Sequence, residues 1–494
     1  MIARLKTLFH EHSFVMVTLL ISSVLRWILI LRGGQFYFSD ESRYGIAQDA
    51  LALMLEGKLR TGLLTLLDEL AHVGFKLTAL VPALFQHAFD TTLVFPAIFF
   101  SFFSILNLFL IWKIALQAGA PLRVANYALL LAASSQVLLY YSRHLFPYDQ
   151  AMFFGLLGLY VALKNNAQPG VPILCGTLSF LCFITYNGYW AIAAFAIIVC
   201  TFNGAKEKNW IVKRPAFLAL GFLAPLAILL LVCFVVGKDV FGDYGVYLQK
   251  IVQGSFSEGW SLPFEYFWYA EHGFSVLIGL FSLLALILFR KKRNPFLYVA
   301  LGGTLFIYLS LVIPSNILHT FVVYGRTARQ IMPFLALSAA YGLSALRSWK
   351  PVGLWLANIV VAMILIQTAW NYSLSYKIVY PREFIQNIQQ RYPEFEVSSK
   401  MMRFYSPLIC QNEGFFLINF HYIHNRLESL PDIQGEMLMR APHPVNFLPY
   451  LYEGYTPEQR QAIRRENYEM TFYKLDPSYL AGHKKEFEKC DQTR

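Results

Sequence analysis

The sequence predicts a mostly α-helical protein that crosses a membrane many times and ends in a small soluble domain. Of its 494 residues, 56% are hydrophobic and only 14% are charged, whereas soluble domains carry about 25% charged residues. The mean hydropathy is +0.46, and long apolar runs recur from the N-terminus to about residue 370. Beyond that point charged residues, Pro and Asn return, and no further long apolar run occurs. This pattern is typical of a polytopic membrane protein with a soluble C-terminal tail.

The length of the apolar runs predicts about eleven membrane spans. A helix that crosses a bilayer needs about 20 mostly apolar residues. The first run follows Arg4 and Lys6 and shows no small-residue cleavage pattern before Arg32, so we interpret it as a retained helix rather than a signal peptide. The approximate limits of the spans are 14–31, 93–116, 124–141, 149–164, 171–186, 188–202, 216–236, 273–290, 296–313, 330–346 and 351–370.

The positions of Lys and Arg predict how these spans are oriented. With the N-terminus in the cytoplasm, the basic clusters fall in cytoplasmic loops, as the positive-inside rule requires. Examples are Lys113 with Arg123 and the run from Arg290 to Arg293. The net charge of +11 therefore reports topology and does not indicate a nucleic-acid partner. The outer face receives the C-terminal tail and residues 32–92, 142–148, 237–272 and 314–329.

Two segments of the first external loop, residues 32–92, predict helices that lie along the membrane surface. In residues 42–56, apolar side chains such as Ala47 and Leu51 recur at helical spacing between polar ones. Residues 74–90 are long enough to count as a twelfth span. If they crossed the membrane, either the first helix or every later basic loop would have an orientation that violates the positive-inside rule. We therefore expect an interfacial helix there.

We expect residues 1–370 to form the membrane domain and residues 371–494 a small extracytoplasmic α/β domain. Within the latter, residues 382–391 predict a helix and residues 415–420 a strand. Four of the six cysteines lie in apolar runs, where thiols behave as small buried hydrophobes. Only Cys410 and Cys490 are placed where they could pair, and the sequence leaves that pairing open.

The segment Phe38 to Tyr44 holds the first candidate catalytic residues, Asp40 and Glu41. Both carboxylates are suited to the start of the 42–56 helix, Asp40 as its N-cap and Glu41 in its first turn. A carboxylate at the rim of a membrane span is also able to act as a general base on an acceptor hydroxyl or amine. The two interpretations are compatible, and the sequence alone does not decide between them.

A second group of polar residues, Arg143, His144 and Asp149, lies between two predicted spans at the same face. The neighbouring tyrosines fit an aromatic belt at the membrane interface, and Asp149 is suited to cap the fourth span. The predicted topology would nevertheless bring Asp149 toward Asp40.

A third group, Arg326 and Arg329, also lies on the outer side, against the positive-inside bias. Two fixed guanidinium groups at membrane depth suit a phosphate, which they grip bidentately. The alternative is that they snorkel from the end of the tenth span. Lys76, in the predicted interfacial helix, is likewise interpreted either as a phosphate ligand or as a side chain that snorkels.

These motifs resemble a known family. Ser39 to Tyr44, which includes Arg43 and is followed by an amphipathic helix, is similar to the first-loop motif of GT-C class glycosyltransferases, specifically the lipid A aminoarabinose transferase and protein O-mannosyltransferase group. The segment from Arg329 to Leu337 resembles that group's Arg-Tyr-x-x-Pro segment, with Gln330 in place of the aromatic residue. The turn from Ser142 to Asp149 is similar to the second external loop of oligosaccharyltransferase catalytic subunits.

The resemblance implies a donor, a sugar carried on a polyprenyl phosphate, and an active site at the outer membrane face. It implies that Asp40 deprotonates the acceptor and that Glu41 supports it or binds the acceptor. Arg329, with Arg326 and Lys76, would bind the departing phosphate, and the anomeric centre would be inverted. Arg43, Tyr44, Arg143, His144 and Asp149 would support the external site.

The chain also departs from the families that it resembles. The Trp-Trp-Asp acceptor motif of oligosaccharyltransferases is absent, which argues against transfer of a whole glycan to asparagine. Asp149 is followed by Gln150 rather than by a second acid, so a divalent metal held by Asp40 and Asp149 is possible but has few ligands.

We therefore expect a glycosyltransferase of a bacterial inner membrane that modifies a lipid, a polysaccharide or a protein. The alternatives are a transporter or flippase of lipid-linked sugars and a catalytically inactive scaffold. Transporters usually show paired structural repeats and interrupted helices, which we do not find in the sequence. The sequence does not identify the sugar, the acceptor, the polyprenol length or the oligomeric state.

Overall fold

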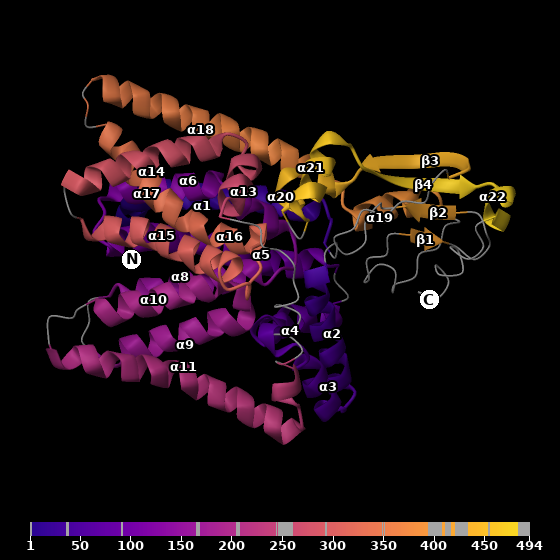
Figure 1. Ribbon diagram of the computed structural model, residues 1–494, viewed down its shortest axis with the longest axis horizontal. Helices are drawn as coiled ribbons and strands as arrows, with labels where there is room; N and C mark the ends of the chain where they lie inside the picture. The colour runs from indigo at the N-terminus through magenta and orange to yellow at the C-terminus, as the bar shows by residue number, and fades with distance from the viewer. Residues whose placement is uncertain are drawn as a thin grey trace.

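The computed structural model shows a bundle of long helices with a small β-sheet region at one end (Figure 1). It describes residues 2–35, 39–89, 92–164, 168–203, 208–243, 245, 260–291, 294–347, 349, 351–393, 408–410, 416–419, 433–452 and 455–482.

A described helix lies at each of the eleven predicted spans. These helices are α1 (Ile2–Leu31), α5 (Val94–Gln117), α6 (Leu122–Ser134) with α7 (Gln136–Leu139), α8 (Tyr148–Ala162), α9 (Gly170–Thr185), α10 (Trp190–Phe202), α11 (Lys208–Val236), α14 (Phe274–Lys291), α15 (Pro295–Asn316), α17 (Met332–Leu346) and α18 (Val352–Lys377). Among the described residues, five helices are long and apolar enough to cross a membrane, or six if the bent pair α6 and α7 forms one span. The protein is thus a multi-span membrane protein, while the count of eleven stays a prediction.

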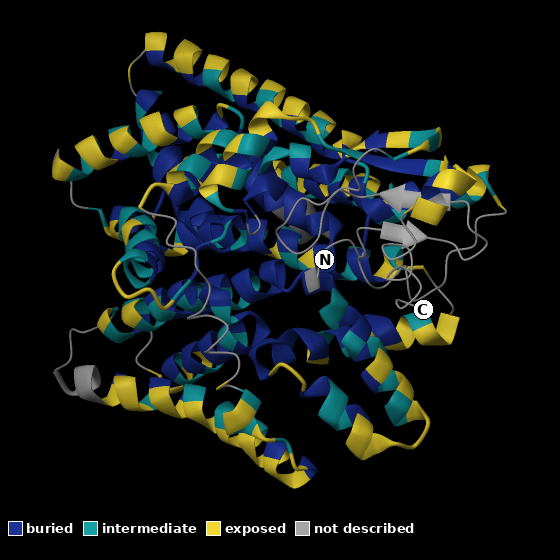
Figure 2. Ribbon diagram, turned by 45° about the vertical axis from the view of Figure 1, so that its right-hand side comes forward, coloured by how far each residue is buried: buried dark blue, intermediate teal, exposed yellow. Residues whose placement is uncertain are grey.

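The outer faces of the bundle are apolar. Figure 2 shows buried residues where the helices meet and exposed residues along the outer helices. Phe234 on α11 and Trp355 on α18 are 82% and 71% exposed. Apolar side chains this exposed are costly in water and are stabilised in lipid, which supports the assignment of these helices to the membrane.

The bend between α6 and α7 follows from a break at Ser135, whose extended backbone interrupts the helix. The two halves meet at 68°. The break leaves backbone donors without helical partners, and such groups must be satisfied when buried. The fully buried carboxylate of Glu271 accepts from the backbone N–H of Gln136 at 2.8 Å and of Val137 at 3.0 Å. A carboxylate far along the chain thus stabilises the approach to the second external turn.

The described residues of the loop 32–92, which was predicted to be external, form three helices and two short 3-10 turns. Helix α2 (Ser42–Leu55) and helix α4 (Val73–Phe89) confirm the two predicted helices, whereas α3 (Leu59–Leu66) was not predicted. The 3-10 turns are η1 (Ser39–Glu41) and η2 (Leu70–His72). In Figure 1, α2 and α3 run across the direction of α8, α9 and α10.

The C-terminal region forms an antiparallel four-stranded sheet in the order β1-β2-β4-β3. Helix α19 (Pro381–Arg391) covers it with Phe384, Ile385 and Ile388, which pack against Met470 and Phe472. The predicted helix at 382–391 and strand at 415–420 are both present. The strands are β1 (Leu408–Cys410), β2 (Phe416–Asn419), β3 (Gly435–Pro442) and β4 (Glu469–Leu475), and the remaining helices are α20 (Leu448–Leu451), α21 (Pro457–Arg465) and α22 (Pro477–Gly482). The proposed domain limit at residue 370 falls inside α18, and Cys490 lies outside the described residues.

The segments predicted to be external gather at one end of the bundle. Figure 1 shows the C-terminal sheet region at the end where α13 (Leu262–Ala270) and α16 (Gly325–Ala328) also lie. Helix α13 contacts both α16 and α20, and α3 contacts α11. Residues distant in the sequence therefore meet at this end.

Candidate active site

Asp40 lies at the centre of the charged residues at this end of the bundle. Its carboxylate pairs with Arg43 of α2 at 2.7 Å. The Nε atom of Arg326, on α16, is 3.7 Å from Oδ2 of Asp40. The hydroxyl of Tyr148, the first residue of α8, donates a hydrogen bond to the same oxygen. Three elements thus hold one carboxylate that is only 8% exposed.

These contacts bear on whether Asp40 serves as a helix cap. The residue at the N-cap position of α2 is Glu41, and it makes no side-chain cap hydrogen bond. The Asp40 side chain is engaged instead with two arginines and a tyrosine. Helix capping therefore does not account for its position.

The surroundings of Asp40 keep it ionised. Burial by itself would raise the pKa of this carboxyl. The fields of Arg43 and Arg326 and the hydrogen bond from Tyr148 outweigh burial and lower the pKa well below its usual range. At neutral pH Asp40 is a carboxylate that is able to accept a hydrogen bond but, held so tightly, is a weak base.

Lys76 contributes a buried positive charge from α4. Its side chain is fully buried, and Nζ has no hydrogen-bond partner among the described residues. Burial lowers the pKa of Lys76 to about 8, although the nearby Glu69 and Asp68 act to raise it. An ammonium group without a partner is costly inside a protein, and such a group indicates a site for an anion.

Asp149 and Arg329 form a separate buried ion pair. Nη2 of Arg329 is 2.5 Å from Oδ1 of Asp149, and the guanidinium carbon lies 4.6 Å from the centre of the Tyr141 ring. Arg329 is fully buried. The two predicted phosphate ligands are thus arranged differently, since Arg326 contacts Asp40 whereas Arg329 contacts Asp149.

Arg143, His144 and Glu41 gather in another place. Glu41 is fully buried and accepts from the backbone N–H of Leu145 at 2.9 Å, and its other oxygen lies 3.6 Å from Nδ1 of His144. Arg143 donates to the carbonyls of Gly33 and Ile378, at 2.7 and 3.1 Å.

Arg143 also pairs with Glu383 on α19, at 3.3 Å. These residues connect the turn at residues 142–148 to the C-terminal region rather than to Asp40. Tyr44 makes a further internal contact, because its hydroxyl donates to Gln86 of α4 at 2.8 Å.

The sequence analysis did not single out three residues that contact this site. Tyr148 bonds Asp40, and Tyr186 accepts a hydrogen bond from Nε of Arg326 at 2.9 Å. His72 stacks on Tyr186, with ring centres 5.4 Å apart and planes inclined by 20°. The tyrosines resembled interfacial belt residues in sequence. A usable signal for His72 was its spacing of four residues before Lys76, one helical turn.

The C-terminal region closes over the arginine-bearing segment. The backbone N–H of Gly325 donates to the carbonyl of Tyr452 at 3.1 Å. A Cβ atom at position 325 would lie 2.8 Å from the Tyr266 ring and 3.0 Å from Cβ of Tyr452. Glycine is therefore required for this close approach, and it fixes the residue next to Arg326.

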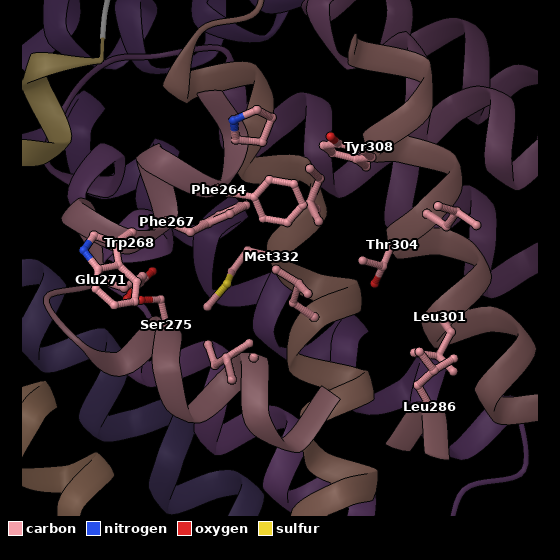
Figure 3. A pocket seen from close by; sticks show the side chains of 16 residues that line it. Phe264, Phe267, Trp268, Glu271, Ser275, Leu286, Leu301, Thr304, Tyr308 and Met332 are labelled. Atoms are coloured by element: carbon pink, nitrogen blue, oxygen red, sulfur yellow. The ribbon is translucent and has the colours of Figure 1, made fainter. Parts of the chain in front are cut away.

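An apolar groove of about 530 Å³ runs along the bundle from this region (Figure 3). Its wall includes Ile331 and Met332, which directly follow the segment that carries Arg326 and Arg329. Figure 3 shows Phe264, Phe267, Trp268 and Met332 around the space, with Glu271 at its edge. Most of the lining side chains are apolar, so the groove suits a hydrocarbon chain.

The described residues include no group of three or more His, Cys, Asp or Glu side chains placed to hold a metal ion. Asp40 and Asp149, named from the sequence as possible metal ligands, pair with different arginines.

The comparisons with known proteins concern the fold. No protein-family model and no curated protein sequence matches the chain. The crystal structure of ArnT from Cupriavidus metallidurans bound to undecaprenyl phosphate is similar, with a TM-score of 0.50 and 14% identity over 77% of this chain and 73% of that chain. The archaeal oligosaccharyltransferase AglB from Archaeoglobus fulgidus, in complex with an inhibitory peptide and a dolichol-phosphate, gives a TM-score of 0.46 and 12% identity over 92% of this chain and 65% of that chain. The protein therefore has the fold of GT-C membrane glycosyltransferases.

Proposed function

We propose that this protein is a glycosyltransferase that moves a sugar from a polyprenyl phosphate to a lipid, polysaccharide or protein acceptor at the outer face of a bacterial inner membrane. The observation that carries the proposal is the contact of Arg326 with the buried Asp40 in a bundle with the GT-C fold, and the unpartnered ammonium of Lys76 supports it. The proposal includes eleven spans, a cytoplasmic N-terminus and an external domain formed by residues 371–494.

Lys76 and Arg326 are the groups best suited to bind the donor phosphate. The ammonium of Lys76 lacks a hydrogen-bond partner among the described residues, and an anion would supply one. Arg326 is held to Asp40 at 3.7 Å, a distance at which a phosphate is able to compete for it. Arg329 is committed to Asp149, so we assign it to the support of the site behind the phosphate.

The apolar groove would hold the lipid part of the donor. Because Ile331 and Met332 follow the arginine-bearing segment directly, a phosphate bound by Arg326 would leave its hydrocarbon chain near the groove. A site that combines an anion-binding end with a long apolar wall suits a lipid phosphate better than a nucleotide sugar, whose base and ribose need polar contacts.

Donor binding would also prepare Asp40 for its role. When Arg326 turns to the phosphate, Asp40 loses part of the positive field that lowers its pKa, and its strength as a base increases. The acceptor then gives its O–H or N–H proton to Asp40 while its oxygen or nitrogen attacks the anomeric carbon. The bond from that carbon to the phosphate oxygen breaks, and the electron pair leaves with the polyprenyl phosphate. A single in-line displacement inverts the anomeric centre.

The C-terminal region is placed to influence the acceptor. It contacts the segment next to Arg326 through Tyr452 and the second external turn through Glu383. We propose that it covers the site and contributes to the choice of acceptor.

Mass spectrometry of the cell envelope tests this proposal. Lipids, polysaccharides and proteins are compared between cells that make the protein and cells that lack it. We expect one class of acceptor to lose the mass of a sugar when the protein is absent. The purified protein in detergent should then transfer that sugar from its polyprenyl phosphate. A flippase needs two membrane faces and would not do so, and the absence of transfer in detergent would contradict the proposal.

A further inference from the structure

His72 is a buried histidine with an open hydrogen-bonding position. It is the last residue of η2 (Leu70–His72), directly before α4. The residue is 3% exposed, and its Nδ1 has no hydrogen-bond partner among the described residues. Buried polar atoms nearly always have partners, so this atom calls for an explanation.

Two neighbours flank the ring. The backbone of Thr185 acts to raise the pKa of His72. A neutral imidazole has one N–H and one lone pair on its two nitrogens, and a proton on Nε2, toward that backbone, would leave the lone pair on Nδ1. The ring face lies on Tyr186, 5.4 Å between centres, and Tyr186 in turn accepts from Arg326. His72 is thus packed against the residues that hold the proposed phosphate ligand.

A second unsatisfied atom lies one helical turn further along the chain. Nζ of Lys76 is also buried and has no hydrogen-bond partner in the described part of the chain. Two such atoms four residues apart would be satisfied by one ligand with an anionic part near Lys76 and a hydrogen-bond donor near His72.

The charges around His72 define what it is able to bind. Burial, Arg43 and Lys76 lower its pKa well below the ordinary value, while Asp40 acts in the opposite direction. The ring is therefore neutral at pH 7, and Nδ1 is an acceptor. An acceptor atom repels a phosphate oxygen but matches a hydroxyl group.

We propose that Nδ1 of His72 accepts a hydrogen bond from a hydroxyl of the sugar that is transferred. This inference rests on the proposed function, which puts the donor phosphate at Lys76 and the attacking acceptor at Asp40. The sugar is the group that lies between the donor phosphate and the attacking acceptor. His72 precedes Lys76 by four residues and stacks on Tyr186, which accepts from Arg326 beside Asp40. It therefore connects the two ends between which that sugar would lie.

Binding measurements with two kinds of lipid separate this role from phosphate binding. The full-length protein in detergent is titrated with undecaprenyl phosphate and with its glucosyl, mannosyl and galactosyl esters. The variants are His72→Leu, which removes the acceptor atom, and His72→Asn, which offers an amide oxygen in its place. Lys76→Met is the control for phosphate binding, and the exposed Lys58→Met controls for loss of a lysine.

We expect His72→Leu to bind undecaprenyl phosphate as the wild type does. It should bind the preferred ester about three- to tenfold more weakly, the effect of one hydrogen bond, and His72→Asn should recover part of the loss. Lys76→Met should weaken both kinds of lipid. Wild-type undecaprenyl phosphate binding by His72→Leu also shows that this variant is folded.

Three results would overturn the inference. Equal weakening of both kinds of lipid by both His72 variants would assign His72 to the support of Lys76 or of the fold. Unchanged binding of every lipid would show that Nδ1 meets no sugar. If none of the three sugar esters bound the wild type more tightly than undecaprenyl phosphate, there would be no sugar contact to assign to His72. If the wild type transferred no sugar at all, the proposed function would fail, which is a separate observation made without these variants.

Discussion

Arg326 and Asp40, from opposite halves of the chain, lie with Nε and Oδ2 3.7 Å apart, while the same Nε donates to Tyr186 at 2.9 Å. The distance to Asp40 is long for a direct hydrogen bond, and the arginine side chain is 13% exposed. Arg326 is thus held near Asp40 without being locked to it. In the proposed function, the arginine exchanges this carboxylate for the donor phosphate.

Replacing Arg326 should affect both donor binding and the pH profile. Arg326→Gln removes a charged hydrogen bond to the phosphate, and we expect kcat/KM for the donor to fall about 10- to 100-fold. It also removes part of the field that lowers the pKa of Asp40. Asp40 must be ionised to accept a proton, so the acid limb of the activity profile should move to higher pH. Transfer rates measured between pH 4 and 8 check this prediction. An acid limb at the same pH in both proteins would show that Arg326 does not influence the ionisation of Asp40.

Lys76 gives a prediction in which stability and function change in opposite directions. Lys76→Met removes a buried, unpartnered ammonium and keeps an apolar chain of similar length. The substitution removes the cost of keeping an ammonium group away from water, so it should stabilise the folded protein. We expect a higher melting temperature at pH 7 and weaker donor binding. A lower melting temperature would show that Lys76 has a stabilising partner.

The pH dependence of stability follows from the same residue. The pKa of Lys76 is lowered to about 8 in the folded protein, against about 10.4 for an ordinary lysine. Between these values the unfolded chain binds more protons than the folded chain, so the wild type gains stability as pH rises. Lys76→Met should lack this gain. Melting curves from pH 7 to 10 distinguish the two proteins, with Lys58→Met expected to follow the wild type.

The buried pair of Asp149 and Arg329 should matter for folding more than for binding. Removing one partner leaves a buried charge alone, which costs about 3–5 kcal/mol. Arg329→Met and Asp149→Leu are therefore each expected to lower the melting temperature strongly, whereas the double variant should melt closer to the wild type. Additive losses in the double variant would mean that the two side chains act independently.

The groove predicts a dependence on the length of the lipid. Gly279 of α14 lines it, and a Cβ atom at this position meets nothing within 4 Å. Gly279→Phe would fill part of the space without displacing neighbours. We expect KM to rise for undecaprenyl-phosphate donors and to stay unchanged for donors with a two-isoprene chain. Gly302→Phe, on α15 and also with open space, is the matched control, and an equal effect of both variants would argue against the groove as the lipid site.

Hydropathy and charge predicted the positions of the long helices because both are local properties of the sequence. They also grouped Asp40 and Arg326 at one face, since alternate loops of a helical bundle share a face. Helix ends were less predictable in two places: the predicted span 124–141 is broken at Ser135, and α18 continues to Lys377, beyond the predicted limit at 370. Such ends are set by packing and turns as well as by hydropathy.

Side-chain pairing could not be predicted in the same way. Glu41 adjoins Asp40 in sequence but contacts Leu145 and His144, since neighbouring residues in a 3-10 turn point in different directions. Arg326 and Arg329 likewise pair with different carboxylates. Tyr186 and His72 could be placed in the site only once α9 and η2 were seen to meet, because that contact joins distant parts of the chain.

Transfer by an Asp40→Asn variant tests the central claim most directly. Asn keeps the shape of Asp40 but cannot take a proton, and Asp49→Asn, on the exposed side of α2, is the matched control. The two purified proteins are given a radiolabelled polyprenyl-phosphate sugar and the acceptor found by mass spectrometry. We predict that Asp40→Asn binds the donor but transfers sugar at least about 100-fold more slowly, as expected for loss of a general base, while Asp49→Asn retains the wild-type rate. Wild-type transfer by Asp40→Asn would contradict the account.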